Sequence, residues 1–140
     1  MKQTFLLLFC LACSIQLFAQ EKLSADNEKA RTSTERLTTM YDLDANQSAK
    51  VYSIQVRKQK QLEQIQSLET SNPELYITKL KALHEGNEGS IKLLLNQEQL
   101  RSYQRNFLRV REERAAKAKA LKEQGASNLE IEKAILAIEQ

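Results

Sequence analysis

The residues that most often carry out chemistry in proteins are scarce in this chain of 140 residues. His84 is its only histidine, and its two cysteines, Cys10 and Cys13, lie close to the N-terminus. A catalytic triad is organised around a histidine, and a structural zinc site needs about four Cys or His ligands. One chain with these residues can build neither, so we expect no enzyme, no metal site and no cofactor.

The charged and glycine-containing stretches supply no stronger candidate for a catalytic or ligand-binding site. Glu112 and Glu113 lie in a charged helical stretch, where solvated carboxylates are the simplest interpretation. "HEGNEGS", residues 84–90, has neither the glycine spacing of a phosphate-binding loop nor a strand before it. A dimer would bring two copies of His84 together, and this is the route to metal binding that stays open.

One short phrase occurs twice, as "LDANQ" at residues 43–47 and as "LNQEQ" at residues 95–99. In each copy an Asp or Asn side chain can cap a helix, and the Gln three residues later can reach back to the backbone N–H of the cap. The leucine before each cap can pack the entering chain against the helix. The phrase therefore predicts two capping boxes and a pseudo-repeat of two helical hairpins. The predicted structural motif residues are Leu43, Asp44, Gln47, Leu95, Asn96 and Gln99.

The elements that position this motif are predicted to be helices. No stretch after the first twenty residues alternates like a strand, and the sequence is rich in Ala, Leu, Glu, Lys and Gln. We expect an elongated all-α fold of four long helices and a short fifth. The expected helices cover residues 24–41, residues 45–68, a segment that starts at Pro73, residues 97–122 and a segment after Ser127.

Three features interrupt these helices. Gly86 and Gly89 each weaken the third helix by about 1 kcal/mol relative to Ala, so we expect a kink or a close backbone approach there. Gly125 is typical of a helix C-terminus. Two cations lie on apolar faces: Lys58 interrupts that of the second helix, and the stripe of the fourth includes Arg114.

The first twenty residues are typical of a secretory signal peptide. A basic start at Lys2 is followed by an apolar run that is too short to span a bilayer. We therefore expect export to the periplasm, with a signal peptide at residues 1–20 and a single all-helical domain at residues 21–140. A lipoprotein anchored through Cys13 is the alternative. Loss of the leader removes both cysteines, so packing alone must hold the mature chain together.

Charge gives little indication of a partner. The net charge of +3 is close to balance. The run at residues 101–122 is basic with interleaved aromatics, a pattern that indicates nucleic acid in a cytosolic protein. Export removes that partner, so we expect no nucleic acid and interpret the run as a packed helix with a charged outer face. Contact with anionic lipid or with acidic segments of another protein stays open.

A Leu-Thr-x-x-Gln motif used twice in a small exported helical protein is the signature of the Spy/CpxP family of periplasmic proteins. Residues 43–47 and 95–99 resemble it, and the resemblance extends over about residues 33–115 through "RLTTMYDLDANQSAKVYSIQVRKQKQLEQI" and "GSIKLLLNQEQLRSYQRNFLRVREER". The threonine positions hold Asp44 and Asn96, which keep a side-chain cap. The tail at residues 116–140 lies outside the motif.

The resemblance implies a cradle-shaped homodimer and an ATP-independent chaperone or envelope stress-response protein, which holds partly unfolded envelope proteins on an amphipathic helical surface. A regulatory module that docks on an envelope stress sensor is the alternative, and an unrelated helical protein is a third. Candidate client-surface residues are Val51, Ile54, Leu80, Leu83, Tyr103 and Phe107, and a position in the core is the alternative for the same residues.

Overall fold

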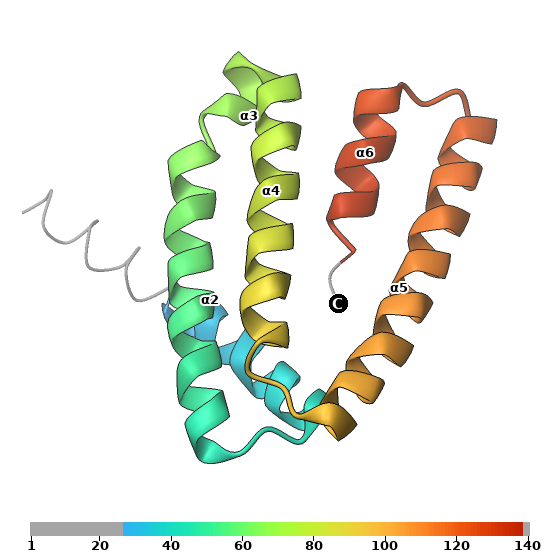
Figure 1. Cartoon of the computed structure of the whole chain (residues 1–140). Helices are drawn as coiled ribbons and strands as arrows, with labels where there is room; N and C mark the ends of the chain where they lie inside the picture. The colour runs from blue at the N-terminus through green and yellow to red at the C-terminus, as the bar shows by residue number, and fades with distance from the viewer. Residues whose placement is uncertain (1–26, 139–140) are drawn as a thin grey trace, which may run out of the picture.

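The computed structural model describes residues 27–138, so the predicted signal peptide lies outside the described residues. Every regular element within this range is a helix, which confirms the all-α prediction. An N-terminal helix, described over residues 27–41, is followed by five more (Figure 1). These are α2 (Ala45–Ile65), α3 (Leu68–Ser71), α4 (Pro73–Lys92), α5 (Gln97–Glu123) and α6 (Asn128–Leu136).

Two hairpins build the molecule (Figure 1). In the first, α2 and α4 lie side by side and are joined through the short α3. In the second, α5 runs back up and α6 returns between α4 and α5, in contact with both. The N-terminal helix lies behind α2 and α4 in this view. The two repeated motifs lie at the lower end, where each hairpin begins.

Four helix starts are capped by side chains, and two of these caps are the capping boxes predicted at Asp44 and Asn96. The side chains of Asp44, Asn96 and Ser127 each accept a hydrogen bond from the third helical N–H, and each forms a complete capping box. Asn72 caps α4 in the same way, with Pro73 in the first turn. Each such cap stabilises its helix by about 1 kcal/mol.

Helix ends follow the predictions less closely. At Gly125, where φ is +80°, α5 stops as expected, because the N–H of Ala126 donates to the carbonyl of Leu121 at 3.0 Å. The second helix ends at Ile65, earlier than predicted, and the chain turns before α3. Asp42 ends the N-terminal helix with φ of 51°, a left-handed conformation that Asp tolerates better than most residues.

The glycines in α4 mark no close approach. The helix runs without a break through Gly86 and Gly89, and a Cβ atom built on either residue meets nothing within 4 Å. The prediction that another part of this chain approaches the backbone there is wrong for the residues that the structure describes.

The apolar core is divided into two clusters. The lower one joins the N-terminal helix, α2, the end of α4 and the start of α5, and the upper one joins α4 and α6. The lower cluster consists of Leu37, Tyr41, Leu43, Val51, Ile91, Leu95 and Tyr103, and the upper one of Ile77, Leu80 and Leu136.

Candidate functional site

The two repeated motifs hydrogen-bond to each other. Gln47 and Gln99, which are 52 residues apart, exchange a pair of amide hydrogen bonds: Gln47 Nε2 donates to Gln99 Oε1 at 2.8 Å, and Gln99 Nε2 donates to Gln47 Oε1 at 2.9 Å. We refer to these two residues as the glutamine clasp. Each motif is therefore the partner of the other, which explains why the phrase occurs twice.

The second hydrogen of each amide reaches the opposite chain segment. Gln47 Nε2 donates to the carbonyl of Leu94 at 2.7 Å, and Gln99 Nε2 donates to that of Asp42 at 3.0 Å. Each of these carbonyls lies two residues before the cap of the opposite motif, so the arrangement is pseudo-twofold symmetric. The carbonyl of Asp42 belongs to the residue with a left-handed backbone.

Each glutamine oxygen also completes its own capping box. The N–H of Asp44 donates to Gln47 Oε1 at 3.0 Å, and that of Asn96 donates to Gln99 Oε1 at 2.9 Å. A primary amide has two donors and two acceptor positions, and in both glutamines all four are used. The clasp thus fixes the start of one hairpin against the start of the other. Its role is structural.

The leucines of the motifs lie within the core. Leu43 is 7% exposed and Leu95 is 8% exposed, and both belong to the lower cluster. Leu100 packs against the same cluster. Leu43 therefore has tertiary neighbours.

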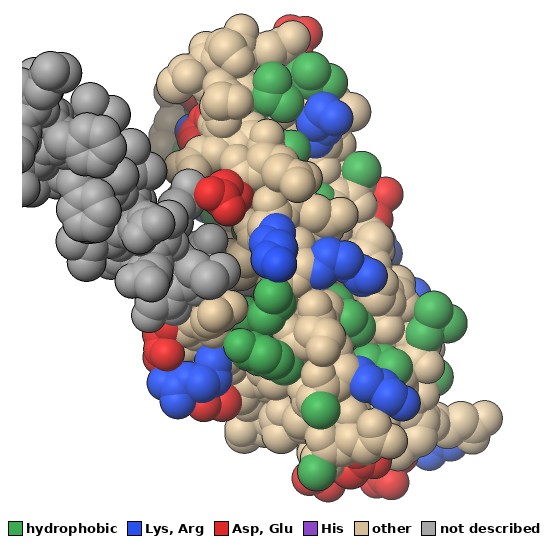
Figure 2. All heavy atoms as spheres, turned by 90° about the vertical axis from the view of Figure 1, so that its left-hand side faces the viewer, with side chains coloured by type: hydrophobic (Ala, Val, Ile, Leu, Met, Phe, Trp, Pro, Cys, Tyr) green, Lys and Arg blue, Asp and Glu red, His purple; other side chains and the backbone are tan. Residues whose placement is uncertain are grey.

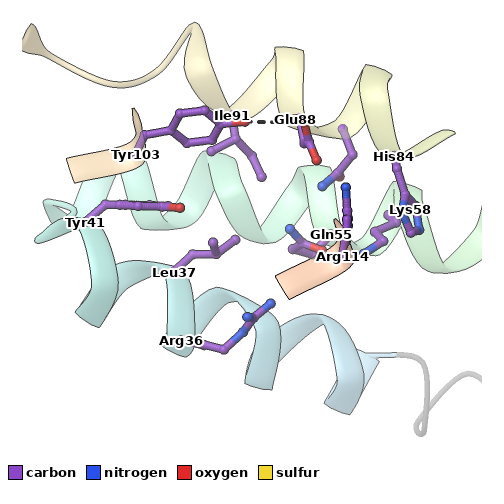
Figure 3. Close-up of a pocket in the computed structure, with 11 residues that line it drawn as sticks. Arg36, Leu37, Tyr41, Gln55, Lys58, His84, Glu88, Ile91, Tyr103 and Arg114 are labelled. Carbon is purple, nitrogen blue, oxygen red and sulfur yellow. Dashed lines mark hydrogen bonds between the residues drawn. The ribbon is translucent and has the colours of Figure 1, made fainter. Parts of the chain in front are cut away.

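A layer of polar side chains separates the two apolar clusters. Figure 3 shows side chains from the N-terminal helix, α2, α4 and α5 around a cavity of about 40 Å³. His84 is partly buried in this wall. We define the polar layer by the cavity-lining residues Arg36, Gln55, Lys58, His84, Asn87, Glu88 and Arg114.

Burial controls the electrostatics of the polar layer. It raises the pKa of the Glu88 carboxyl, while the positive charge of Arg114 and a hydrogen bond from the Tyr103 hydroxyl at 3.4 Å lower that pKa. Burial also raises the pKa of the Tyr41 hydroxyl, against a hydrogen bond from Asn106 at 3.2 Å. Burial in this layer therefore makes the Glu88 carboxyl harder to ionise than it is in water.

Three of the expected client-surface residues are core residues instead. Val51 is fully buried, Tyr103 is 6% exposed and Leu80 is 8% exposed. Their spacing along the helices reflects faces that the chain's own helices cover. For these three side chains the structure therefore agrees with the core alternative within the described chain.

The other three candidate surface residues differ in how far they are exposed. Ile54 is partly buried against the lower cluster, and Leu83 is partly buried beside a groove between α2 and α4. Phe107 is 40% exposed and stacks on Tyr103, with ring centroids 6.5 Å apart. Of the six, Phe107 alone is substantially exposed.

Exposed leucines were missed by the sequence analysis. Leu108 is 53% exposed on α5, and Leu93 is 89% exposed in the turn before α5. Both lie off the apolar stripes that identify a buried face. A leucine outside the apolar stripe of its helix was the signal in the sequence that could have identified these exposed positions.

A groove between α4 and α6 was also missed. It encloses about 200 Å³ and its apolar lining comes from Pro73, Tyr76, Ile77 and Leu129. An ion pair between Lys133 and Glu69 lies at the same groove, which therefore combines apolar walls with charges of both signs.

On one face of the molecule the hydrophobic side chains are scattered (Figure 2). On the side of the molecule shown in Figure 2, they form separate groups among basic side chains. Within residues 27–138, no helix combines the length and apolar character that crossing a membrane requires. Over the same range, no three His, Cys, Asp or Glu side chains gather where they could hold a metal ion.

Fold and motif together define a class: an all-α protein of two hairpins joined through a repeated capping box. Comparisons of the chain with protein-family models, with curated proteins and with solved structures found no match. The resemblance to the Spy/CpxP family therefore rests on the motif in the sequence.

Proposed function

We propose that this protein is an exported, ATP-independent chaperone that holds partly unfolded envelope proteins on its helical surface. The observation that carries the proposal is the pair Phe107 and Leu108, exposed side by side on α5. Exposed large apolar side chains on a rigid helix offer a client burial area without requiring a shaped pocket.

Two basic side chains flank Leu108 on α5. Arg105 and Arg111 are one helical turn before and after Leu108, and both are exposed. Arginine stems extend apolar contact area while their charged ends stay in water. Such a surface suits unfolded segments that mix apolar and acidic residues, and it releases them without nucleotide because each contact is weak.

The glutamine clasp supports the same proposal indirectly. It fixes two hairpins against each other, so α5 presents its outer face from a defined scaffold. A homodimer would bring two such faces into one assembly, as the family resemblance implies. We include that dimer in the proposal.

The proposal is tested by aggregation of two unrelated denatured clients, without ATP, in the presence of the mature chain from Glu21. We expect suppression of both. The double variant Phe107→Ser/Leu108→Ser should lose most of this suppression, because it removes about 3 kcal/mol or more of potential apolar contact. Gln104→Ser, an exposed substitution on the same helix, serves as the matched control. A double variant as active as wild type would move the client surface away from α5.

The groove between α4 and α6 favours the alternative, a regulatory module with one partner. Its volume of about 200 Å³ and the ion pair of Lys133 with Glu69 suit a single apolar side chain within a charged segment. A regulator should bind one envelope stress sensor tightly and ignore denatured clients. Leu129→Ser should abolish that binding and leave client aggregation unaffected.

A further inference from the structure

Positive charge is concentrated on the outer side of α5. This helix lies at the edge of the molecule, with α6 packed along one side of it (Figure 1). At about 3.6 residues per turn, the positions within about 60° of Leu108 on either side form one face of the helix, which we call the basic face. All of its cations are exposed, and they are Arg101, Arg105, Arg111, Lys119 and Lys122.

The cations of the basic face are available to a partner. Arg105 donates a hydrogen bond only to a serine within α5, and the other four form no ion pair or hydrogen bond with the described residues. The engaged cations of α5 lie off this face. Arg109 is paired with Glu113 at 3.1 Å, and Arg114 donates to the carbonyl of Ile138 at 2.6 Å.

Two acidic residues lie on the same face and leave it positive. Glu112 and Glu123 each follow a cation directly in the sequence, and neighbours of this kind point in different directions on a helix. The cations outnumber these acids by five to two. They are spread over about 30 Å of helix, from Arg101 to Lys122, so a complementary partner must be negative over a similar length.

An exposed leucine lies in the middle of the basic face. Leu108 is 53% exposed, and one helical turn separates it from Arg105 and from Arg111. Acidic protein segments could pair with the cations but offer this side chain no apolar environment of their own. An anionic membrane surface offers both, because its charged headgroups cover an apolar interior and helices of this composition lie along that boundary.

We propose that the basic face docks the protein on an anionic lipid surface, with its cations on the headgroup phosphates and Leu108 between the acyl chains. Each cation near such a surface raises the affinity about fivefold. This function goes beyond the proposed chaperone activity, because it determines where the protein is held. Leu108 belongs to both surfaces, so lipid and client compete for it. The two proposals fail separately, since client aggregation is measured without lipid.

Cosedimentation with lipid vesicles is the first test. The mature chain from Glu21 is used, so that the apolar leader contributes nothing to binding. Vesicles contain either phosphatidylcholine alone or phosphatidylcholine with about 30% phosphatidylglycerol. We expect binding to the anionic vesicles and little to the neutral ones. Equal binding to both, or binding to neither, would overturn the proposal.

Matched lysine variants locate the docking surface. Lys119→Gln/Lys122→Gln removes two cations from the basic face, and we expect about 25-fold weaker binding to the anionic vesicles. Lys60→Gln/Lys79→Gln removes the same charge from exposed positions on α2 and α4 and should weaken binding much less. If both variants weaken binding equally, overall charge attracts the vesicles and the basic face is not the docking surface.

Insertion of Leu108 distinguishes a membrane from an acidic protein. The sequence contains no tryptophan, so Leu108→Trp introduces a single fluorescent probe. Its emission should shift to shorter wavelength on anionic vesicles and be quenched by brominated acyl chains. Gln64→Trp, on the exposed side of α2, should show neither change. Vesicle binding without quenching at Leu108→Trp, or tighter binding of polyglutamate than of vesicles, would overturn the proposal and assign the basic face to acidic protein segments.

Discussion

Gln99 at the base of the bundle and Gln55 in its middle are both glutamines on helices, and they are 7% and 2% exposed. Gln99 uses all four of its amide hydrogen-bonding positions, with Gln47, Asp42 and its own cap as partners. Gln55 leaves its buried oxygen without a partner in the described chain. The same type of side chain thus stabilises the fold at Gln99 and destabilises it at Gln55.

The difference lies in what surrounds each amide. The clasp lies at helix starts, where backbone N–H and C=O groups are unsatisfied by the helix itself and available as partners. Gln55 lies in mid-helix, where backbone groups are already paired within the helices. A buried amide there depends on other side chains or on a bound molecule.

The largest expected effect comes from breaking the clasp. Gln99→Ala leaves the amide of Gln47, the carbonyl of Asp42 and the N–H of Asn96 short of partners, so we expect a loss of about 3 kcal/mol in the free energy of unfolding. Urea unfolding measures it, with Gln104→Ala on the exposed face of α5 as control. The double variant Gln47→Ala/Gln99→Ala should lose less than the sum of the single variants. Strict additivity would mean that the two amides do not act together.

A substitution in the polar layer is expected to change the free energy of unfolding by a smaller amount and in the opposite direction. Gln55→Leu removes the unsatisfied oxygen and adds apolar contact, so the free energy of unfolding should rise by about 1 kcal/mol. Gln64→Leu, on the exposed side of α2, measures the effect of the same substitution on the helix alone. Destabilisation by Gln55→Leu beyond that control would show that Gln55 contributes to the fold as the clasp does.

The two regions also differ in how far the sequence predicts them. The caps at Asp44 and Asn96 are local signals, because a capping box needs only four neighbouring residues. The pairing of Gln47 with Gln99 depends on how distant segments meet. Corresponding residues of the two motifs are separated by the same number of positions, and this constant separation was the available hint of that contact.

The polar layer also left a trace in the sequence. Lys58 interrupts the apolar face of α2, Arg114 lies in the stripe of α5, and both line the cavity. Cations on inward faces of two helices indicate a shared polar site, although spacing alone cannot show that they meet. For the same reason, the stripes that contain Val51 in α2 and Tyr103 in α5 predicted apolar faces correctly but could not show which helices cover them.

The smallest expected effect is a pH dependence that belongs to the polar layer. Burial raises the pKa of Glu88 above its ordinary value of 4.5, so the folded state holds this proton more tightly than the unfolded chain does. Stability should therefore fall as the pH rises from about 4.5 through the raised pKa of the folded state. Arg114, Tyr103 and Lys92 oppose the shift, which keeps the effect small.

Glu88→Gln tests this dependence by removing the titrating group. The variant should gain stability over wild type on the neutral side of this window and lose the advantage at lower pH, as followed by thermal unfolding across the window. Glu112→Gln makes the same chemical change at an exposed position on α5. If the difference between Glu88→Gln and wild type does not change with pH, the carboxyl of Glu88 ionises as readily in the fold as in the unfolded chain. The polar layer would then not disfavour a negative charge at this position.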